Sequence, residues 1–243
     1  MSGAATDVAG ALGRASVYRL LGRAFTVPTA AVLAELERGA ATAAAAPGTP
    51  PAVAARLGEL AAAASAGDPA ALAEEFVRLF HRQARCAPYE GAYGTAPQMA
   101  GKGVLLADVA GFYAAFGFGP ASPAETEDHV GAELEFMSLL ALKEAWALAE
   151  GHDDGLAVVR AAQRAFLADH LGRWAGAFAG DLAAASPSPY YAAAAGLLER
   201  WMAVELEAFG VSAPRAARLA TTSEEAAPLA CPMAAPEPAP IEE

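Results

Sequence analysis

Residues 125–137 read ETEDHVGAELEFM, a stretch with five carboxylates, one histidine and no basic side chain. Such a set could serve as general acid and base, coordinate a metal, or receive a positively charged partner. On a helix, His129, Glu133 and Phe136 fall on one stripe, beside an apolar stripe that starts at Val130. The stretch is therefore the first candidate for a functional site.

Metal binding and catalysis have little support beyond this stretch. His129 and Glu133 lie one helical turn apart, but two ligands are too few for a metal site. A general-base pair of Asp128 and His129 would need a nucleophile or a phosphate loop, and the sequence has no GxSxG turn and no glycine-rich loop. We predict a protein that is not an enzyme, with no metal and no cofactor. A small-molecule- or nucleotide-binding protein that uses Asp128 and His129 remains the alternative.

A plain structural explanation also competes. Carboxylates such as Glu127 and Asp128 are favoured at a helix N-terminus, where we expect Asp128 to open the helix. His129 can pair with Glu133 one turn further on. The remaining explanation is recognition, because carboxylates beside an apolar stripe suit a peptide that carries arginines and then hydrophobic residues.

The composition indicates which fold must position these residues. The chain has 243 residues, 55% of them hydrophobic, with many alanines and a single isoleucine, Ile241. Strands favour β-branched residues, whereas Ala and Leu favour helices. The sequence therefore predicts an all-α fold of about eight or nine helices.

The net charge of −12 is unevenly distributed. Residues 1–100 hold eight acidic and eight basic side chains, whereas residues 101–243 hold 20 acidic and eight basic ones. Nucleic-acid binding requires a basic surface, so we exclude it. An acidic second half attracts cationic peptides instead.

Composition shifts divide the chain into four parts. We expect an N-terminal helical lobe over 1–117, a Gly- and Pro-containing hinge over 118–124, and a C-terminal helical lobe over 125–212. Residues 213–243 are rich in Ala, Pro and Glu, and they predict a disordered tail.

Local signals place the boundaries of several helices. Asp68 followed by Pro69 predicts a helix start, with Asp as the cap and Pro in the first position. Residues 84–99 have no periodicity and predict a long loop. After the helix that follows the acidic stretch, the pattern predicts two further helices, over 156–180 and 189–209.

The cysteines and the N-terminus bear on the compartment. Cys86 and Cys231 do not form a framework of spaced pairs, so a disulfide scaffold is not expected. The first 25 residues predict an amphipathic helix rather than a signal peptide, and no apolar run reaches the roughly 20 residues that span a membrane. We predict a cytoplasmic, reduced protein without a membrane span.

Several segments in this order resemble the TorD/DmsD family of redox-enzyme maturation chaperones. The resemblance covers roughly residues 10–210. It rests on the first helix with YRLL at 18–21, on FVRLF at 76–80, on APYEGAY at 87–93 and on ETEDH at 125–129. Thr126 stands where the family motif has proline, which indicates a looser turn before Asp128.

The resemblance implies an all-helical chaperone that binds the apo catalytic subunit of a molybdopterin (DMSO-reductase-type) oxidoreductase. Binding in this family is often to the twin-arginine signal peptide, and the client is held until the molybdenum cofactor is inserted. Family members can exchange lobes about the linker, so the protein is expected to be a monomer or a domain-swapped dimer. Which molybdoenzyme is the client stays open.

The resemblance and the acidic stretch together predict a client-binding site. Carboxylates would receive arginines in bidentate geometry, and aromatic rings would line the apolar part. The predicted contact residues are Tyr89, Glu90, Tyr93, Glu125, Glu127, Asp128, His129, Glu133 and Phe136. A plain helical interaction module for another partner remains an alternative.

Overall fold

A computed structural model of the chain describes residues 2–81, 86–94, 99–119, 126–212 and 216–218. Within these ranges the regular structure is helical, which confirms the predicted all-α class. The α-helices are α1 (Ser2–Ala24), α2 (Ala30–Ala44), α3 (Pro51–Ala66), α4 (Pro69–Phe80), α5 (Met99–Phe116), α6 (Val130–Glu150), α7 (Asp153–Asp169), α8 (Leu171–Ala185) and α9 (Pro189–Ala208). A short 3-10 turn, η1 (Glu90–Ala92), precedes α5.

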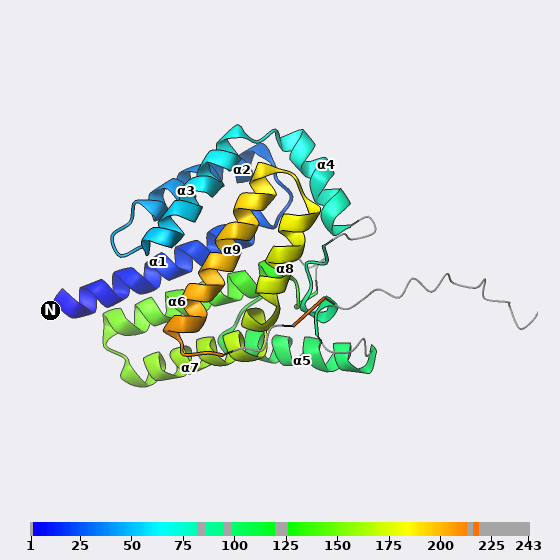
Figure 1. Cartoon of the computed structure of the whole chain (residues 1–243). Coiled ribbons are helices and arrows are strands. Elements are labelled where there is room, and N and C mark those ends of the chain that lie inside the picture. Colours follow the sequence, from blue (N-terminus) through cyan, green and yellow to red (C-terminus); the bar gives the residue numbers. More distant parts are fainter. Residues whose placement is uncertain (1, 82–85, 95–98, 120–125, 213–215, 219–243) are drawn as a thin grey trace, which may run out of the picture.

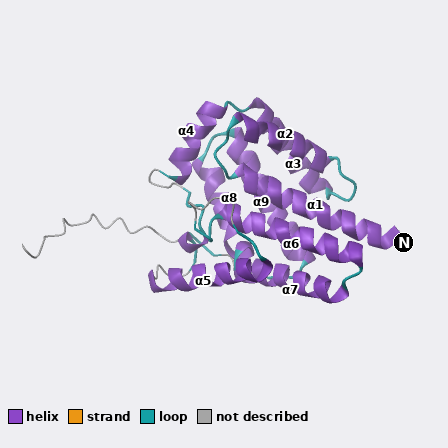
Figure 2. Cartoon of the chain, turned by 180° about the vertical axis from the view of Figure 1, so that it is seen from behind, coloured by secondary structure: helices purple, strands orange, loops and turns teal. Residues whose placement is uncertain are grey.

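The helices form three layers, which Figures 1 and 2 show from opposite sides. Helices α2, α3 and α4 cover one side, and α5 and α7 cover the other. Between them, α1 lies along α6, while α9 packs on α8 and α3. None of the described helices is long and apolar enough to cross a membrane.

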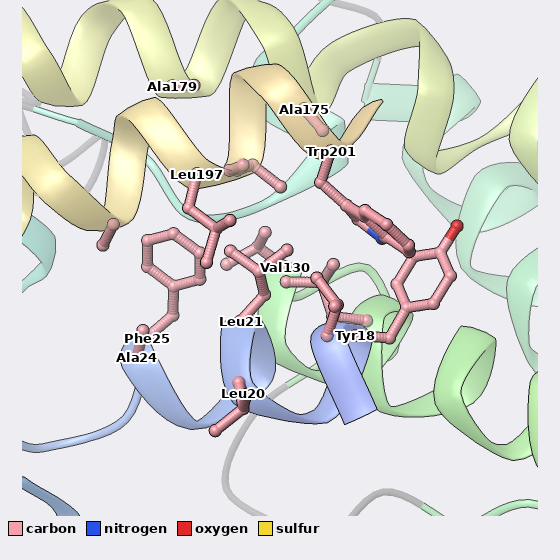
Figure 3. Packing of buried hydrophobic residues seen from close by; sticks show 14 of the residues in the cluster. Tyr18, Leu20, Leu21, Ala24, Phe25, Val130, Ala175, Ala179, Leu197 and Trp201 are labelled. Atoms are coloured by element: carbon pink, nitrogen blue, oxygen red, sulfur yellow. The ribbon is translucent and has the colours of Figure 1, made fainter. Parts of the chain in front are cut away.

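The buried apolar residues form one continuous core between α1, α6, α8 and α9, as Figure 3 shows. The ring of Tyr18 meets that of Trp201 edge to face at 5.3 Å, and Phe25 meets Phe178 in the same way at 5.3 Å. Because the core draws on residues from both sides of the predicted hinge, the two predicted lobes are packed together here. The hinge over 118–124 lies mostly outside the described residues, so the lobe boundary remains a prediction.

Helix starts with strong local signals agree with the prediction. Asp68 caps α4 by accepting a hydrogen bond from the backbone N–H of Ala70 at 3.1 Å, and Pro69 occupies the first helical position. This cap needs only residues that are adjacent in the sequence, which is why it was predictable.

The predicted helix over 156–180 is wrong, because the chain breaks at His170 between α7 and α8. The backbone turns back sharply after Leu167, and a Cβ atom at Gly172 would lie 2.2 Å from the carbonyl oxygen of Leu167. Only glycine tolerates such a close approach. The break also places His170 next to the loop before α5, where it takes part in the site described below.

The beginning of the predicted tail contacts the helical body. The backbone N–H of Ala216 donates to the carbonyl of Arg173 at 2.9 Å, and that of Gly94 donates to the carbonyl of Ala217 at 2.9 Å. Residues 216–218 therefore differ from the disordered tail that composition predicts. Backbone hydrogen bonds hold them, and amino-acid composition carries no information about such bonds. Residues 219–243, with Cys231, lie outside the described residues.

Candidate functional site

Two segments from the sequence-based hypothesis, 86–94 and 126–133, lie against each other. Tyr89 and His129 form an antiparallel bridge between them. The N–H of Glu90 donates to the carbonyl of Asp128 at 2.9 Å, and the N–H of Val130 donates to the carbonyl of Pro88 at 2.8 Å. We call this contact the loop–helix junction. The sequence-based grouping of these segments into one site is consistent with this geometry.

Asp128 is fully buried at the centre of the junction. One carboxylate oxygen accepts a hydrogen bond from the N–H of Gly91 at 3.1 Å, and the other accepts one from the hydroxyl of Thr126. Helix α6 is capped by His129, whose Nδ1 accepts from the N–H of Gly131 at 3.1 Å. The expectation that Asp128 opens the helix is therefore wrong. Asp128 instead lies in the turn before the helix, where its carbonyl accepts from the N–H of Glu90 in the loop.

A second group of buried polar side chains lies behind Asp128. The indole N–H of Trp174 donates to Glu133 at 3.1 Å, and both side chains are fully buried. Nδ1 of His170 lies 3.1 Å from the carboxylate of Glu90, and its Nε2 lies 3.4 Å from the carboxylate of Asp108 on α5. The remaining oxygen of Glu133, Oε1, has no hydrogen-bond partner among the described residues. The break before α8 is thus what brings a histidine to the junction.

Burial and neighbouring charge favour a protonated Glu133. Burial, followed by the charge of Glu90, raises the pKa of Glu133 well above 4.5, and the hydrogen bond from Trp174 opposes this only in part. The same surroundings act on Tyr113, whose pKa is raised by burial and then by the charges of Glu133 and Asp128. Because Glu133 is protonated in the folded state, the stability of the fold should depend on pH.

Glu133→Gln should therefore stabilise the protein as the pH rises. A raised pKa in the folded state contributes stability that is fully present below about pH 4.5 and is lost as pH rises through the folded-state pKa. Glutamine mimics the protonated carboxyl group and does not titrate. We expect its advantage over the parent to grow by up to about 1.4 kcal/mol per pH unit within that window.

Urea unfolding of parent and variant across a pH series measures this difference. The matched control is Glu135→Gln, the same substitution at a partly exposed position of α6, measured over the same pH series. The series covers roughly pH 4 to pH 8. A constant difference in unfolding free energy between Glu133→Gln and the parent over this range would contradict a raised pKa of Glu133.

The two aromatic residues from the deeper part of the predicted site are buried. Phe136 is fully buried, and its ring lies 4.9 Å from that of Tyr113 and 4.8 Å from that of Phe166. The ring of Tyr93 lies 5.3 Å from that of Trp174 in a tilted arrangement, and the hydroxyl of Tyr93 donates to Asp181 at 3.3 Å. These rings hold the junction in place from behind.

The predicted contact residues thus separate by exposure. Tyr89 and Glu127 are partly exposed at the rim of the junction. Glu125 lies outside the described residues. The buried members are Glu90, Tyr93, Asp128, His129, Glu133 and Phe136. As it stands, the junction offers a client only its rim.

Sequence reasoning missed a second buried polar network, centred on Arg14 of α1. Its guanidinium donates to Glu144 at 2.6 Å and to Glu205 at 2.9–3.1 Å, and it also donates to the side-chain oxygen of Gln163. The hydroxyl of Tyr18 donates to Glu205 at 2.9 Å. One signal was available, because Arg14 and Tyr18 share the face of α1 that otherwise carries apolar residues.

The charges in this network support one another. Burial alone would lower the pKa of Arg14, but the hydrogen bond and charge of Glu205 raise it on balance. Burial would raise the pKa of Glu144, but the hydrogen bond from Gln163 and the charge of Arg14 lower it. The network thus keeps α1, α6, α7 and α9 together through ionised groups.

These arrangements show little that could drive catalysis. Among the described residues, no group of three or more His, Cys, Asp or Glu side chains has the arrangement of a metal site. The thiol of Cys86 is buried, and burial raises its pKa to about 12, which keeps it from acting as a thiolate. The loop–helix junction instead holds the loop 86–94 against the start of α6 and keeps Glu133 protonated.

Comparison with known proteins identifies the family. Residues 46–180 match the family model described as nitrate reductase delta subunit. No curated protein matches the chain. The matched region runs from the loop between α2 and α3 into α8, covers more than half of the chain and includes the loop–helix junction. The chain belongs to the nitrate reductase delta subunit family, a family of molybdoenzyme maturation chaperones to which the resemblance to TorD/DmsD proteins also pointed.

Proposed function

We propose that the protein is a cytoplasmic chaperone that binds the apo catalytic subunit of a molybdopterin oxidoreductase and holds it until the molybdenum cofactor is inserted. The observation that carries this proposal is the family match, because it includes both segments of the loop–helix junction. The acidic charge of residues 101–243 supports a cationic target such as a twin-arginine signal peptide.

The junction suggests how a client arginine would be received. Glu127 lies at the rim, and Glu90 and Glu133 lie behind it, with one oxygen of Glu133 lacking a hydrogen-bond partner among the described residues. A guanidinium group pairs well with carboxylates, and its charge would favour loss of the proton that Glu133 keeps beside Glu90. A client arginine would therefore contact Glu127 at the rim first and reach the buried carboxylates afterwards.

Helix α5 makes polar contacts with the residues around the buried carboxylates. The hydroxyl of Tyr113 donates to the carbonyl of Glu127 at 2.8 Å, and Asp108 lies 3.4 Å from His170. A client arginine would reach Glu133 only if α5 shifted outward. We include this shift in the proposed binding mechanism.

Affinity capture from the native host tests the function. The tagged chain should retain a molybdopterin oxidoreductase catalytic subunit that lacks its cofactor. Capture of an unrelated protein would favour a general interaction module, and turnover of a small molecule by the chain alone would favour an enzyme.

Removing the rim charge should weaken the binding of a twin-arginine peptide. Glu127→Gln keeps the side-chain shape but removes one charged hydrogen-bond acceptor, which corresponds to about tenfold in affinity. The loss should be greater at low salt than at high salt. Titration calorimetry measures it, with Glu199→Gln as the control at an exposed position on α9. Equal affinities for the two variants would exclude the rim as a contact.

A further inference from the structure

Large apolar side chains are exposed together where α5 and α6 end and α7 begins. Trp146 is 58% exposed and Val158 is 60% exposed, although the other two tryptophans, Trp174 and Trp201, are buried. They border a hollow of about 350 Å³, which we call the α6–α7 hollow. Its lining residues are Phe116, Lys143, Trp146, Ala147, Asp154, Gly155, Val158 and Val159.

The hollow is part of a well-defined local structure. Gly155 leaves room at the start of α7, where a Cβ atom would lie 3.0 Å from Nδ1 of the capping residue His152. The ring of Trp146 lies 5.9 Å from that of His152. The indole is therefore held beside the cap of α7, although more than half of it faces solvent.

The floor of the hollow continues into the aromatic core. Val159 is buried, and the ring of Phe116 lies 6.1 Å from that of Phe136. An apolar side chain placed in the hollow would therefore contact the same cluster that supports the loop–helix junction. Exposed apolar patches of this kind mark interaction sites on soluble proteins.

The charges around the hollow indicate what occupies it. Asp154 lines it, against one cation in the lining, Lys143. Asp153, next to Asp154 in the chain, and Glu150, the last residue of α6, are also exposed. Arg160 does not offset them, because it pairs with Glu144 of α6 at 2.8 Å and lines a different hollow. The rim is therefore acidic and the interior apolar.

We propose that the α6–α7 hollow binds the apolar part of a client segment whose flanking arginine or lysine residues lie against Asp153, Asp154 and Glu150. The proposal rests on the proposed chaperone function, since the segment belongs to the client. It assigns a docking surface separate from the loop–helix junction. An anionic or purely polar segment does not fit this chemistry.

Trp146 reports on occupancy by itself, because it is the exposed one of the three tryptophans. The probe is a synthetic peptide with two arginines followed by a Leu- and Ala-rich stretch. Its binding should protect the tryptophan fluorescence from quenching by acrylamide. The same peptide with glutamates in place of the arginines should give no protection at equal concentration.

Val158→Asp places a carboxylate on the apolar lining and should weaken peptide binding about tenfold or more, which equals the loss of one well-buried apolar contact. The matched control is Val27→Asp, the same substitution at a residue that is 50% exposed and lies before α2. It should bind as the parent does. Circular dichroism of both variants checks that they fold.

Three results would overturn the inference. The first is that adding the peptide leaves the acrylamide quenching of the parent unchanged. The second is that Val158→Asp and Val27→Asp bind the peptide with equal affinity. The third is protection of Trp146 that depends only on protein concentration, which would assign the hollow to a second copy of the chain. Capture of the client from lysate distinguishes a failure of this inference from a failure of the proposed function. If Val158→Asp retains the apo catalytic subunit as well as the parent does, the hollow is not the docking surface and the chaperone function stands. If the parent retains no such subunit, the chaperone function fails.

Discussion

Arg14→Met is expected to lower the free energy of unfolding by about 3–5 kcal/mol, the usual range when one partner of a buried ion pair is removed. Methionine approximates the length of the side chain but leaves Glu144 and Glu205 without their shared cation. The side chains of these two carboxylates are only 5% and 1% exposed, so solvent screens their charges weakly once the guanidinium is removed. Urea unfolding followed by circular dichroism measures the loss.

Arg160→Met is the matched control for this experiment. Arg160 also pairs with Glu144, at 2.8 Å, but its side chain is 50% exposed. Exposed ion pairs contribute little, so we expect a loss below about 1 kcal/mol. Adding Glu205→Gln to Arg14→Met removes the charge of the more buried carboxylate, while Glu144 keeps its ion pair with Arg160, and should recover part of the stability. Equal losses of unfolding free energy for the two arginine variants would show that burial of the ion pairs does not determine how much they contribute.

The helices could be predicted where their signals are local. Asp68 and Pro69 specify the start of α4 without any distant partner, and the structure confirms them. The break at His170 could not be predicted in the same way, because the residues around it favour a helix. It depends on the close approach between Gly172 and Leu167, which only the packed chain reveals.

The candidate site was predictable as a group but not in its orientation. Helical periodicity placed His129, Glu133 and Phe136 on one stripe, whereas the structure has His129 at the N-cap of α6 and buries all three side chains. Whether that stripe faces water depends on the loop 86–94 and on α5, which close over it. Burial of Asp128 depends on Gly91, which is 37 residues earlier in the chain. No pattern within α6 contains that information.

The same reasoning explains why Trp146 escaped the sequence analysis. Aromatic residues in a helical pattern most often belong to the core, and Trp174 and Trp201 do. Trp146 lies one turn before the end of α6, where the neighbouring α7 begins only after a turn at Gly151. The exposure of its ring follows from where helices end, and that is the least predictable feature of a helical bundle.

Phe136→Ala should cost the fold about 3–5 kcal/mol, the range for truncating a buried phenylalanine. Its ring joins α6 to both helices of the outer layer. The neighbouring rings are those of Phe112, Tyr113, Phe116 and Phe118 from α5 and the residues after it, and that of Phe166 from α7. The cavity would remove the main apolar support of α5, so amide hydrogens of 99–116 should exchange faster than those of the other helices.

Phe136→Leu distinguishes a core role from a role in client contact. Leucine fills most of the space and should cost the fold much less, since less buried volume is removed. If Phe136 supports the fold, Phe136→Leu should bind the client peptide nearly as the parent does, and only Phe136→Ala should lose binding together with stability. If Phe136 instead contacts the client directly, as its place on one helical stripe with His129 and Glu133 suggested, Phe136→Leu should lose affinity while its unfolding curve changes little. Calorimetric binding and urea unfolding of both variants decide between the two, because a residue buried behind α5 can affect the client only through the stability of α5.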